Sequence, residues 1–135
     1  MTSNNFAVEP ARTNLPVIGI VGVCASGKSS LISGLSELGY RTKHIAQEHS
    51  YVPSMWQRIS HPDTLIYLHA SYATTVQRRK LSWSVAEYEE QIKRLEHARL
   101  HANLYIDTDE LTPQEVLDRA IFHLKNLGWF DGQDD

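Results

Sequence analysis

The feature that most constrains the fold is a glycine-rich segment, residues 22–29, that stands between two apolar stretches. It reads Gly-Val-Cys-Ala-Ser-Gly-Lys-Ser and matches the pattern G-x-x-x-x-G-K-S at every fixed position. Residues 17–21 before it are apolar and mostly β-branched, which is typical of a buried parallel strand. After it, apolar residues recur at helical spacing: Leu31, Ile32, Leu35 and Leu38. The segment is therefore predicted to join a strand to a helix over residues 28–38, which Gly39 ends.

This turn has the residue types that a phosphate-binding loop needs. Gly22 and Gly27 permit backbone conformations that a Cβ would obstruct, so that the N–H groups of the loop surround the phosphates. The positive end of the following helix adds to the attraction. The pattern assigns Lys28 to the β- and γ-phosphates, as a catalytic group, and Ser29 to Mg²⁺. The residues expected to bind a nucleoside triphosphate are Gly22, Cys24, Ala25, Ser26, Gly27, Lys28, Ser29 and Ser30.

The rest of the chain alternates predicted strands and helices. Further strands are expected over residues 40–46, 64–68 and 104–106, and helices over residues 53–59, 71–79, 85–101 and 113–127. Capping boxes open two of these helices, one formed by Ser84 with Glu87 and one by Thr112 with Glu115. This alternation indicates parallel strands joined by right-handed crossovers, hence an α/β three-layer sandwich with a mainly parallel sheet. In such sheets ligands bind at the carboxyl ends of the strands.

Two of these helices have predicted buried faces. For the helix over residues 85–101 the face comprises Val85, Tyr88, Ile92, Leu95 and Ala98. For the last helix, which Gly128 ends, it comprises Val116, Leu117, Ala120, Ile121, Leu124 and Leu127.

Length and composition indicate one globular domain. The chain has 135 residues, and we expect a domain over residues 16–130, a flexible tail over residues 1–15 and an acidic tail over residues 131–135. The net charge is −3, but three aspartates lie in the last five residues, so the remainder is neutral and nucleic acid is not an expected partner. No apolar run approaches the ~20 residues of a membrane span.

The expected location of the protein follows from two further features. The N-terminal residues lack the apolar region of a secretory signal, and the single cysteine, Cys24, rules out an intrachain disulfide. A cytoplasmic protein is therefore expected. Cys24 itself is expected to fill space within the loop, with a redox switch that blocks phosphate as the alternative.

The chain resembles the P-loop kinases of small molecules and nucleotides, the group that holds shikimate, gluconate, adenylate and thymidylate kinases. Three segments carry the resemblance, namely the glycine-rich loop, residues 65–71 followed by Val76, Arg78 and Arg79, and residues 102–109 with 111–116. The resemblance spans most of residues 16–128. It implies a P-loop NTPase fold of reduced size, ATP or GTP with Mg²⁺ as cofactors, and phosphoryl transfer to a small-molecule or nucleotide acceptor.

The chain also departs from the pattern of these kinases. His69 stands where the family often has an acid after the strand, and about 17 residues, 47–63, occupy the place of the usual substrate-binding insert. Only residues 81–83 separate Lys80 from the next predicted helix, where the family has a lid domain. These departures predict a minimal kinase-like core, or one that needs a partner to complete its site; a homo-oligomer is left open.

Outside the loop, the resemblance assigns roles to one acid and two arginines. Glu48 follows the second predicted strand, where it would orient the acceptor or hold Mg²⁺; the alternative is a solvated surface glutamate. Arg78 and Arg79 correspond to lid arginines that clamp phosphates, or else form a solvated basic helix end. Because adjacent residues on a helix point apart, we expect at least one arginine, and not both, to reach a single ligand.

The remaining candidates have weaker assignments. Asp107 and Asp109 follow the fourth predicted strand, where the resemblance implies a role near the nucleotide base; Asp109 alternatively starts a turn. The spacing of His44, Glu48 and His49 does not match a zinc pattern. An aromatic and apolar group in the expected short helix is predicted to pack in the core, or else to face an acceptor or a second subunit; it comprises Tyr51, Met55 and Trp56.

Two other classes of function remain. One is a nucleotide-binding regulatory or assembly protein with little turnover, which the short acceptor region and His69 favour. The other is an ATPase that acts on nucleic acid, and the neutral core disfavours it. The sequence thus predicts an ATP-dependent kinase of a small molecule or nucleotide, with the regulatory protein as the alternative.

Overall fold

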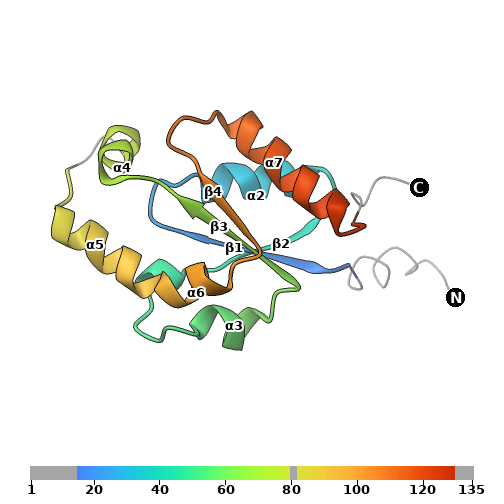
Figure 1. Ribbon diagram of the computed structural model, residues 1–135, viewed down its shortest axis with the longest axis horizontal. Helices are drawn as coiled ribbons and strands as arrows, with labels where there is room; N and C mark the ends of the chain where they lie inside the picture. The colour runs from blue at the N-terminus through green and yellow to red at the C-terminus, as the bar shows by residue number, and fades with distance from the viewer. Residues whose placement is uncertain (1–14, 80–81, 130–135) are drawn as a thin grey trace, which may run out of the picture.

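The computed structural model describes residues 15–79 and 82–129. Its centre is a four-stranded sheet in the order β2-β1-β3-β4 (Figure 1). The strands are β1 (Val17–Gly22), β2 (Arg41–His44), β3 (Thr64–His69) and β4 (Leu104–Asp107), and every neighbouring pair is parallel. The predicted α/β fold with a parallel sheet is therefore confirmed. The expected tails lie outside the described residues, apart from Leu15.

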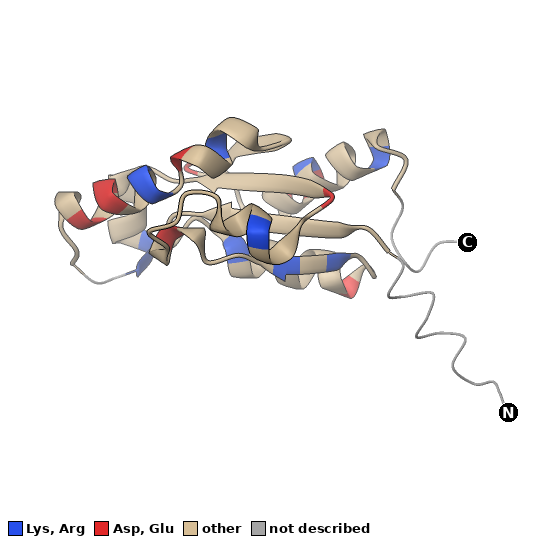
Figure 2. Ribbon diagram, turned by 90° about the horizontal axis from the view of Figure 1, so that it is seen from below, with Lys and Arg blue, Asp and Glu red and all other residues tan. Residues whose placement is uncertain are grey.

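Helices cover both faces of this sheet (Figure 1). One face packs against α2 (Lys28–Glu37) and α7 (Pro113–Asn126), and the other against α3 (Met55–Ser60), α5 (Val85–Arg94) and α6 (Glu96–His101). A short 3-10 helix, η2 (Gln47–His49), follows β2, and α4 (Tyr72–Arg79) follows β3. Figure 2 shows Lys and Arg interspersed with Asp and Glu over these helices.

The period of two along the strands divides the apolar residues between the two faces. Ile18 and Ile20 on β1 are fully buried in the cluster that includes Leu31, Leu35 and Leu124 from α2 and α7. On the opposite face, Val21, Leu65 and Tyr67 pack with Trp56, Leu95 and Ala98 from the helices there. Because alternate residues of a strand point to opposite faces, one apolar strand supplies both cores.

Local capping signals are also confirmed. The Ser84 hydroxyl accepts from the N–H of Glu87 at 3.0 Å, and the Thr112 hydroxyl accepts from the N–H of Glu115 at 3.1 Å. Gly39 and Gly128 follow α2 and α7 with φ values of 96° and 83°, a conformation that favours glycine. Helix ends are therefore encoded by nearby residues.

Two predictions about the helices were wrong. The expected helix over residues 85–101 is divided into α5 and α6 at Leu95, whose N–H is shared between the carbonyls of Gln91 and Ile92. The predicted inner faces also fail at the helix ends, because Val85 is 48% exposed and Leu127 is 46% exposed. A periodic pattern continues to the end of a helix, whereas burial stops where the neighbouring layer stops.

Among the helices of residues 15–79 and 82–129, none is both long enough and apolar enough to cross a membrane.

Candidate functional site

The glycine-rich loop, residues 22–29, connects β1 to α2 through a tight turn. At Gly22 a Cβ would lie 2.5 Å from the carbonyl oxygen of Leu68 and 2.6 Å from the hydroxyl of Ser26. Gly22 is therefore needed for the close approach of β1, β3 and the loop. Gly27 is needed for its conformation, since its φ is 105°, and Ala25 also has a positive φ of 67°.

The start of α2 has the character of an anion site. Gly27 caps the helix without a side-chain hydrogen bond, and its first turn carries no acidic residue. Ser29 and Ser30 are exposed there. The hydroxyl of Ser26 is buried and has no hydrogen-bond partner within the described part of the chain. The N–H groups at this end and the helix dipole together favour a negatively charged ligand.

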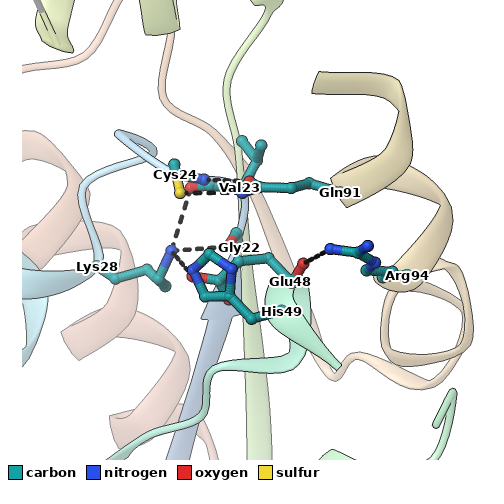
Figure 3. A network of polar contacts seen from close by, with 8 residues as sticks. All are labelled: Gly22, Val23, Cys24, Lys28, Glu48, His49, Gln91 and Arg94. Carbon is teal, nitrogen blue, oxygen red and sulfur yellow. Dashed lines mark hydrogen bonds and ion pairs between the residues drawn. The ribbon is translucent and has the colours of Figure 1, made fainter. Parts of the chain in front are cut away.

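Lys28 forms a buried ion pair with Glu48 beside the loop (Figure 3). Its Nζ lies 3.1 Å from Glu48 Oε2 and donates to the carbonyls of Gly22 at 2.7 Å and Val23 at 3.1 Å. The two side chains are only 7% and 4% exposed. The alternative that Glu48 is a solvated surface residue is therefore wrong. Its Oε1 is buried and has no hydrogen-bond partner among residues 15–79 and 82–129.

Gln47 holds Glu48 in this position. It is fully buried, and its side-chain amide donates to the carbonyls of Val52 at 2.9 Å and Arg94 at 3.2 Å. Its oxygen accepts from the N–H of Trp56 at 2.8 Å. These bonds fix η2 at the carboxyl end of β2, next to β1. Sheet order thus brings Glu48 to the loop, and Gln47 orients it.

Gln91 on α5 clamps Cys24 of the loop through both ends of its amide (Figure 3). The Cys24 N–H donates to Gln91 Oε1 at 3.0 Å, and Gln91 Nε2 donates to Cys24 Sγ at 3.1 Å. Gln91 is buried, whereas Cys24 is partly exposed. The thiol therefore has a defined direction and does more than fill space.

The two adjacent arginines diverge, as their helical spacing predicts. The Arg78 guanidinium donates to the carbonyls of Ala25 and Thr108 and to the Thr108 hydroxyl, so it ties the loop to the end of β4. Arg79 instead lies over the ring of Trp83, with Cζ 4.9 Å from its centroid. Each arginine therefore meets a different part of the site.

The last residue of β4, Asp107, and the residues that follow it make different contacts. Thr108 is buried, and its hydroxyl donates to the Ser26 carbonyl at 2.9 Å. Asp107 is exposed, and its carboxylate accepts from the N–H of Asp109 at 3.0 Å. Asp109 accepts from the N–H of Ser71 at 2.9 Å. Partial burial raises the pKa of Asp109, but hydrogen bonds from Ser71 and Thr74 outweigh it and lower the pKa from its ordinary value.

Cavities lie on two sides of the loop, and the described residues that line one do not line the other. The first, about 180 Å³, lies between the start of α2 and the β4–α7 connection; the residues that line it are Ser26, Gly27, Ser30, Leu31, Arg78, Thr108, Leu111, Pro113 and Val116. The second, about 510 Å³, lies between the loop, η2 and α5, and its lining includes Cys24, His49, Arg79, Trp83, Gln91 and Arg94. We call them the Thr108 cavity and the Cys24 cavity. Neither Asp107 nor Asp109 lines either one.

The group of Tyr51, Met55 and Trp56 is divided by the structure. Trp56 is 5% exposed and packs in the core, and Met55 is partly buried against the same cluster. Tyr51 is 80% exposed, so its predicted core position is wrong. Its ring lies under the Arg94 guanidinium, with Cζ 4.4 Å from the centroid.

Sequence reasoning missed Gln47, Gln91 and Arg94 as parts of the site. Gln91 had a detectable signal, because it stands three residues after Tyr88 and four before Leu95, a polar residue within an apolar helical stripe. Gln47 had no such signal, since its partners are backbone groups of Val52, Trp56 and Arg94 that only the folded chain brings together.

A scan of the chain against models of known protein families gives no match, and a search of the curated proteins finds none either.

Proposed function

We propose that this protein binds a nucleoside triphosphate, ATP in preference to GTP, at the glycine-rich loop and transfers its γ-phosphoryl group to a small-molecule or nucleotide acceptor. The single observation that carries the proposal is the arrangement of the loop. An uncapped helix start, a positive-φ glycine and a buried lysine surround one point at the carboxyl end of β1. This combination favours a phosphate chain over other anions.

The residues at this point fit Mg²⁺ as a cofactor. Glu48 presents a buried carboxylate oxygen with no hydrogen-bond partner among the described residues, and Ser29 presents an exposed hydroxyl at the start of α2. Hard oxygen ligands of this kind suit magnesium. Ser29 and Glu48 would hold the ion, which would neutralise charge on the phosphates of a bound nucleotide.

Lys28 and Glu48 would act by electrostatic stabilisation of the phosphates and their metal ion, and not by covalent catalysis. Lys28 is already oriented by two loop carbonyls and is positioned to neutralise charge that spreads over the phosphates during transfer. Its ion pair with Glu48 keeps both groups aligned. Phosphoryl transfer gains mainly from positioning of this sort, because little proton chemistry is required of the protein.

We assign the nucleotide and the acceptor to different cavities. We assign the nucleotide base to the Thr108 cavity, where Leu31, Leu111 and Pro113 provide apolar walls next to Gly27. We assign the acceptor to the Cys24 cavity, which is larger and carries Arg79, Arg94 and His49. Arg78 and Arg79 then act on different ligands, one beside the base and one beside the acceptor.

The test is transfer of phosphate from Mg-ATP to a panel of nucleoside monophosphates and small alcohols. We expect transfer to at least one acceptor, with Lys28→Ala lowering the rate on the order of 10²–10³-fold. Lys43→Ala, an exposed lysine on β2, is the matched control and should keep the wild-type rate. Equal activity of wild type and Lys28→Ala would contradict the proposal.

The alternative function is a nucleotide-binding regulatory protein with little turnover. One observation favours it: the segment between η2 and β3 contains only the short helix α3, so no large element closes over the acceptor cavity from that side. Tight binding of Mg-ATP without transfer to any acceptor would support this alternative.

A further inference from the structure

Three potential metal ligands from two separate segments meet beside the loop. Sγ of Cys24, a carboxylate oxygen of Glu48 and a ring nitrogen of His49 all lie within 4.8 Å of one another. Cys24 comes from the loop, whereas Glu48 and His49 come from η2. We propose that these three side chains form a binding site for a borderline-soft divalent transition metal of the Zn²⁺ class.

The chemistry of the ligand set selects the metal. Thiolate and imidazole ligands favour zinc-like ions, whereas Mg²⁺ prefers oxygen ligands alone. One sulfur, one nitrogen and one oxygen are the three atom types that bind Zn²⁺ in proteins. The site is therefore distinct in kind from the magnesium position assigned to Ser29 and Glu48, although it uses the same carboxylate.

Glu48 provides independent evidence for a missing ligand. Its side chain is 4% exposed, and its Oε1 has no hydrogen-bond partner within residues 15–79 and 82–129. A buried carboxylate oxygen without a partner is costly, because folding removes its water without replacing it. A metal ion bound at Oε1 would supply the partner, while Oε2 keeps its contacts with Lys28 at 3.1 Å and His49 at 3.7 Å.

Small movements would complete the coordination. Bond lengths of 2.0–2.3 Å in a tetrahedral site place ligand atoms about 3.3–3.8 Å apart. His49 Nε2 is already 3.7 Å from Glu48 Oε2, and the His49 ring is 59% exposed, so it has room to rotate. Because the ligand atoms of all three residues lie within 4.8 Å of one another, shifts of about 1–1.5 Å at most would close the site.

Gln91 and Lys28 set the strength of the site in opposite directions. Gln91 Nε2 donates to Cys24 Sγ, which is the outer-shell hydrogen bond that orients a metal ligand. Lys28 carries a positive charge 3.1 Å from Glu48 Oε2 and opposes a cation there. The site is therefore one for a reversibly bound ion, with three protein ligands and an open fourth position.

The metal and the magnesium nucleotide would compete, because both use Glu48. This consequence rests on the proposed function, whereas the metal site does not. Zinc at the site would therefore inhibit phosphoryl transfer, and Mg-ATP would lower the apparent affinity for zinc.

The test is a titration of the nucleotide-free, full-length protein with Co²⁺, followed by displacement with Zn²⁺. We expect one Co²⁺ per chain and a near-ultraviolet sulfur-to-cobalt charge-transfer band, which Cys24→Ser abolishes. His49→Ala should weaken Zn²⁺ binding by more than tenfold, and Gln91→Leu by about 10- to 100-fold. Lys28→Ala should tighten it, while it weakens the binding of ATP.

Two exposed histidines serve as controls. His44→Ala at the end of β2 should leave metal binding unchanged. His101→Ala disrupts the stacked His97–His101 pair on α6, a rival site without sulfur, and should leave the charge-transfer band intact. Absence of the band in the wild-type protein, or full affinity in both Cys24→Ser and His49→Ala, would overturn the proposal. Thermal shift with Mg-ATP tests nucleotide binding separately, so the two proposals fail independently.

Discussion

The Thr108 cavity and the Cys24 cavity border the same loop but differ in how their polar groups are satisfied. On the Thr108 side, the Arg78 guanidinium and the Thr108 hydroxyl are bonded to carbonyls of the chain, the walls are largely apolar, and the unpartnered buried group among the described residues is the neutral Ser26 hydroxyl. On the Cys24 side, a buried ion pair stands next to a carboxylate oxygen that has no hydrogen-bond partner among the described residues. On the Thr108 side the chain itself holds the charged group in place. On the Cys24 side the Glu48 carboxylate remains available to a ligand.

The two sides differ in how fully their buried polar and charged groups are hydrogen-bonded. A saturated polar network rigidifies its surroundings, whereas a partly satisfied one has a high cost that a ligand can relieve. The loop therefore presents a preorganised wall on one side and a charged, adaptable set of groups on the other.

The ion pair on the Cys24 side should be the most sensitive point. Lys28→Ala leaves Glu48 buried without its partner, so we expect the free energy of unfolding to fall by about 3–5 kcal/mol. In Lys28→Met/Glu48→Leu both charges are gone, and most of this loss should be recovered. Urea unfolding of both variants measures the effect. If Lys28→Ala were as stable as Lys43→Ala, the carboxylate would have to be hydrated and the contrast between the sides would fail.

The adjacent arginines should separate the two sides functionally. Under the proposed function, Arg78→Ala should raise KM for the nucleotide about tenfold, roughly 1.4 kcal/mol, and leave KM for the acceptor unchanged. Arg79→Ala should do the reverse, because this residue lines the Cys24 cavity. Steady-state kinetics with each substrate varied gives both constants, and Arg119→Ala on the exposed side of α7 is the control. Equal effects of both arginines on one substrate would refute the division.

Asp109, which accepts from the Ser71 N–H, should contribute a small stabilisation of the fold that is lost in acid. Its pKa is lowered in the folded protein, so the unfolded chain binds more protons as the pH falls below the ordinary value of 3.8. The stabilisation is therefore complete above that pH and is lost as the pH falls through the folded pKa. Because the group is only partly buried and solvent screens it, we expect an effect of about 1 kcal/mol or less.

Asp109→Asn keeps the acceptor oxygen for the Ser71 N–H but removes the titration. Unfolding in urea between about pH 3 and pH 6 should then show a shallower loss of stability in acid than for wild type. Asp118→Asn on the exposed face of α7 provides a comparison at another carboxylate. Identical acid profiles for wild type and Asp109→Asn would show that this carboxylate has no such role.

The local signals in the sequence predicted most of the fold. The apolar run before the loop, the helical spacing after it and both capping boxes depend on residues a few positions apart, and all of them match the structure. Predictions failed where burial depends on neighbouring layers. Tyr51, Val85 and Leu127 are apolar or aromatic residues in or next to helices, yet they remain exposed because no layer covers them.

Local patterns in the sequence were enough to predict the loop, the alternation of strands and helices, and the positions at which the helices begin. Tertiary structure alone decided that Glu48 lies against Lys28, that Gln91 clamps Cys24 and that Arg78 and Arg79 belong to different cavities. The physical reason is the order of the strands, since the side chains that meet at the carboxyl edge depend on which strands are neighbours. Periodicity and capping depend on short windows of sequence, whereas the site is assembled from residues up to 82 positions apart.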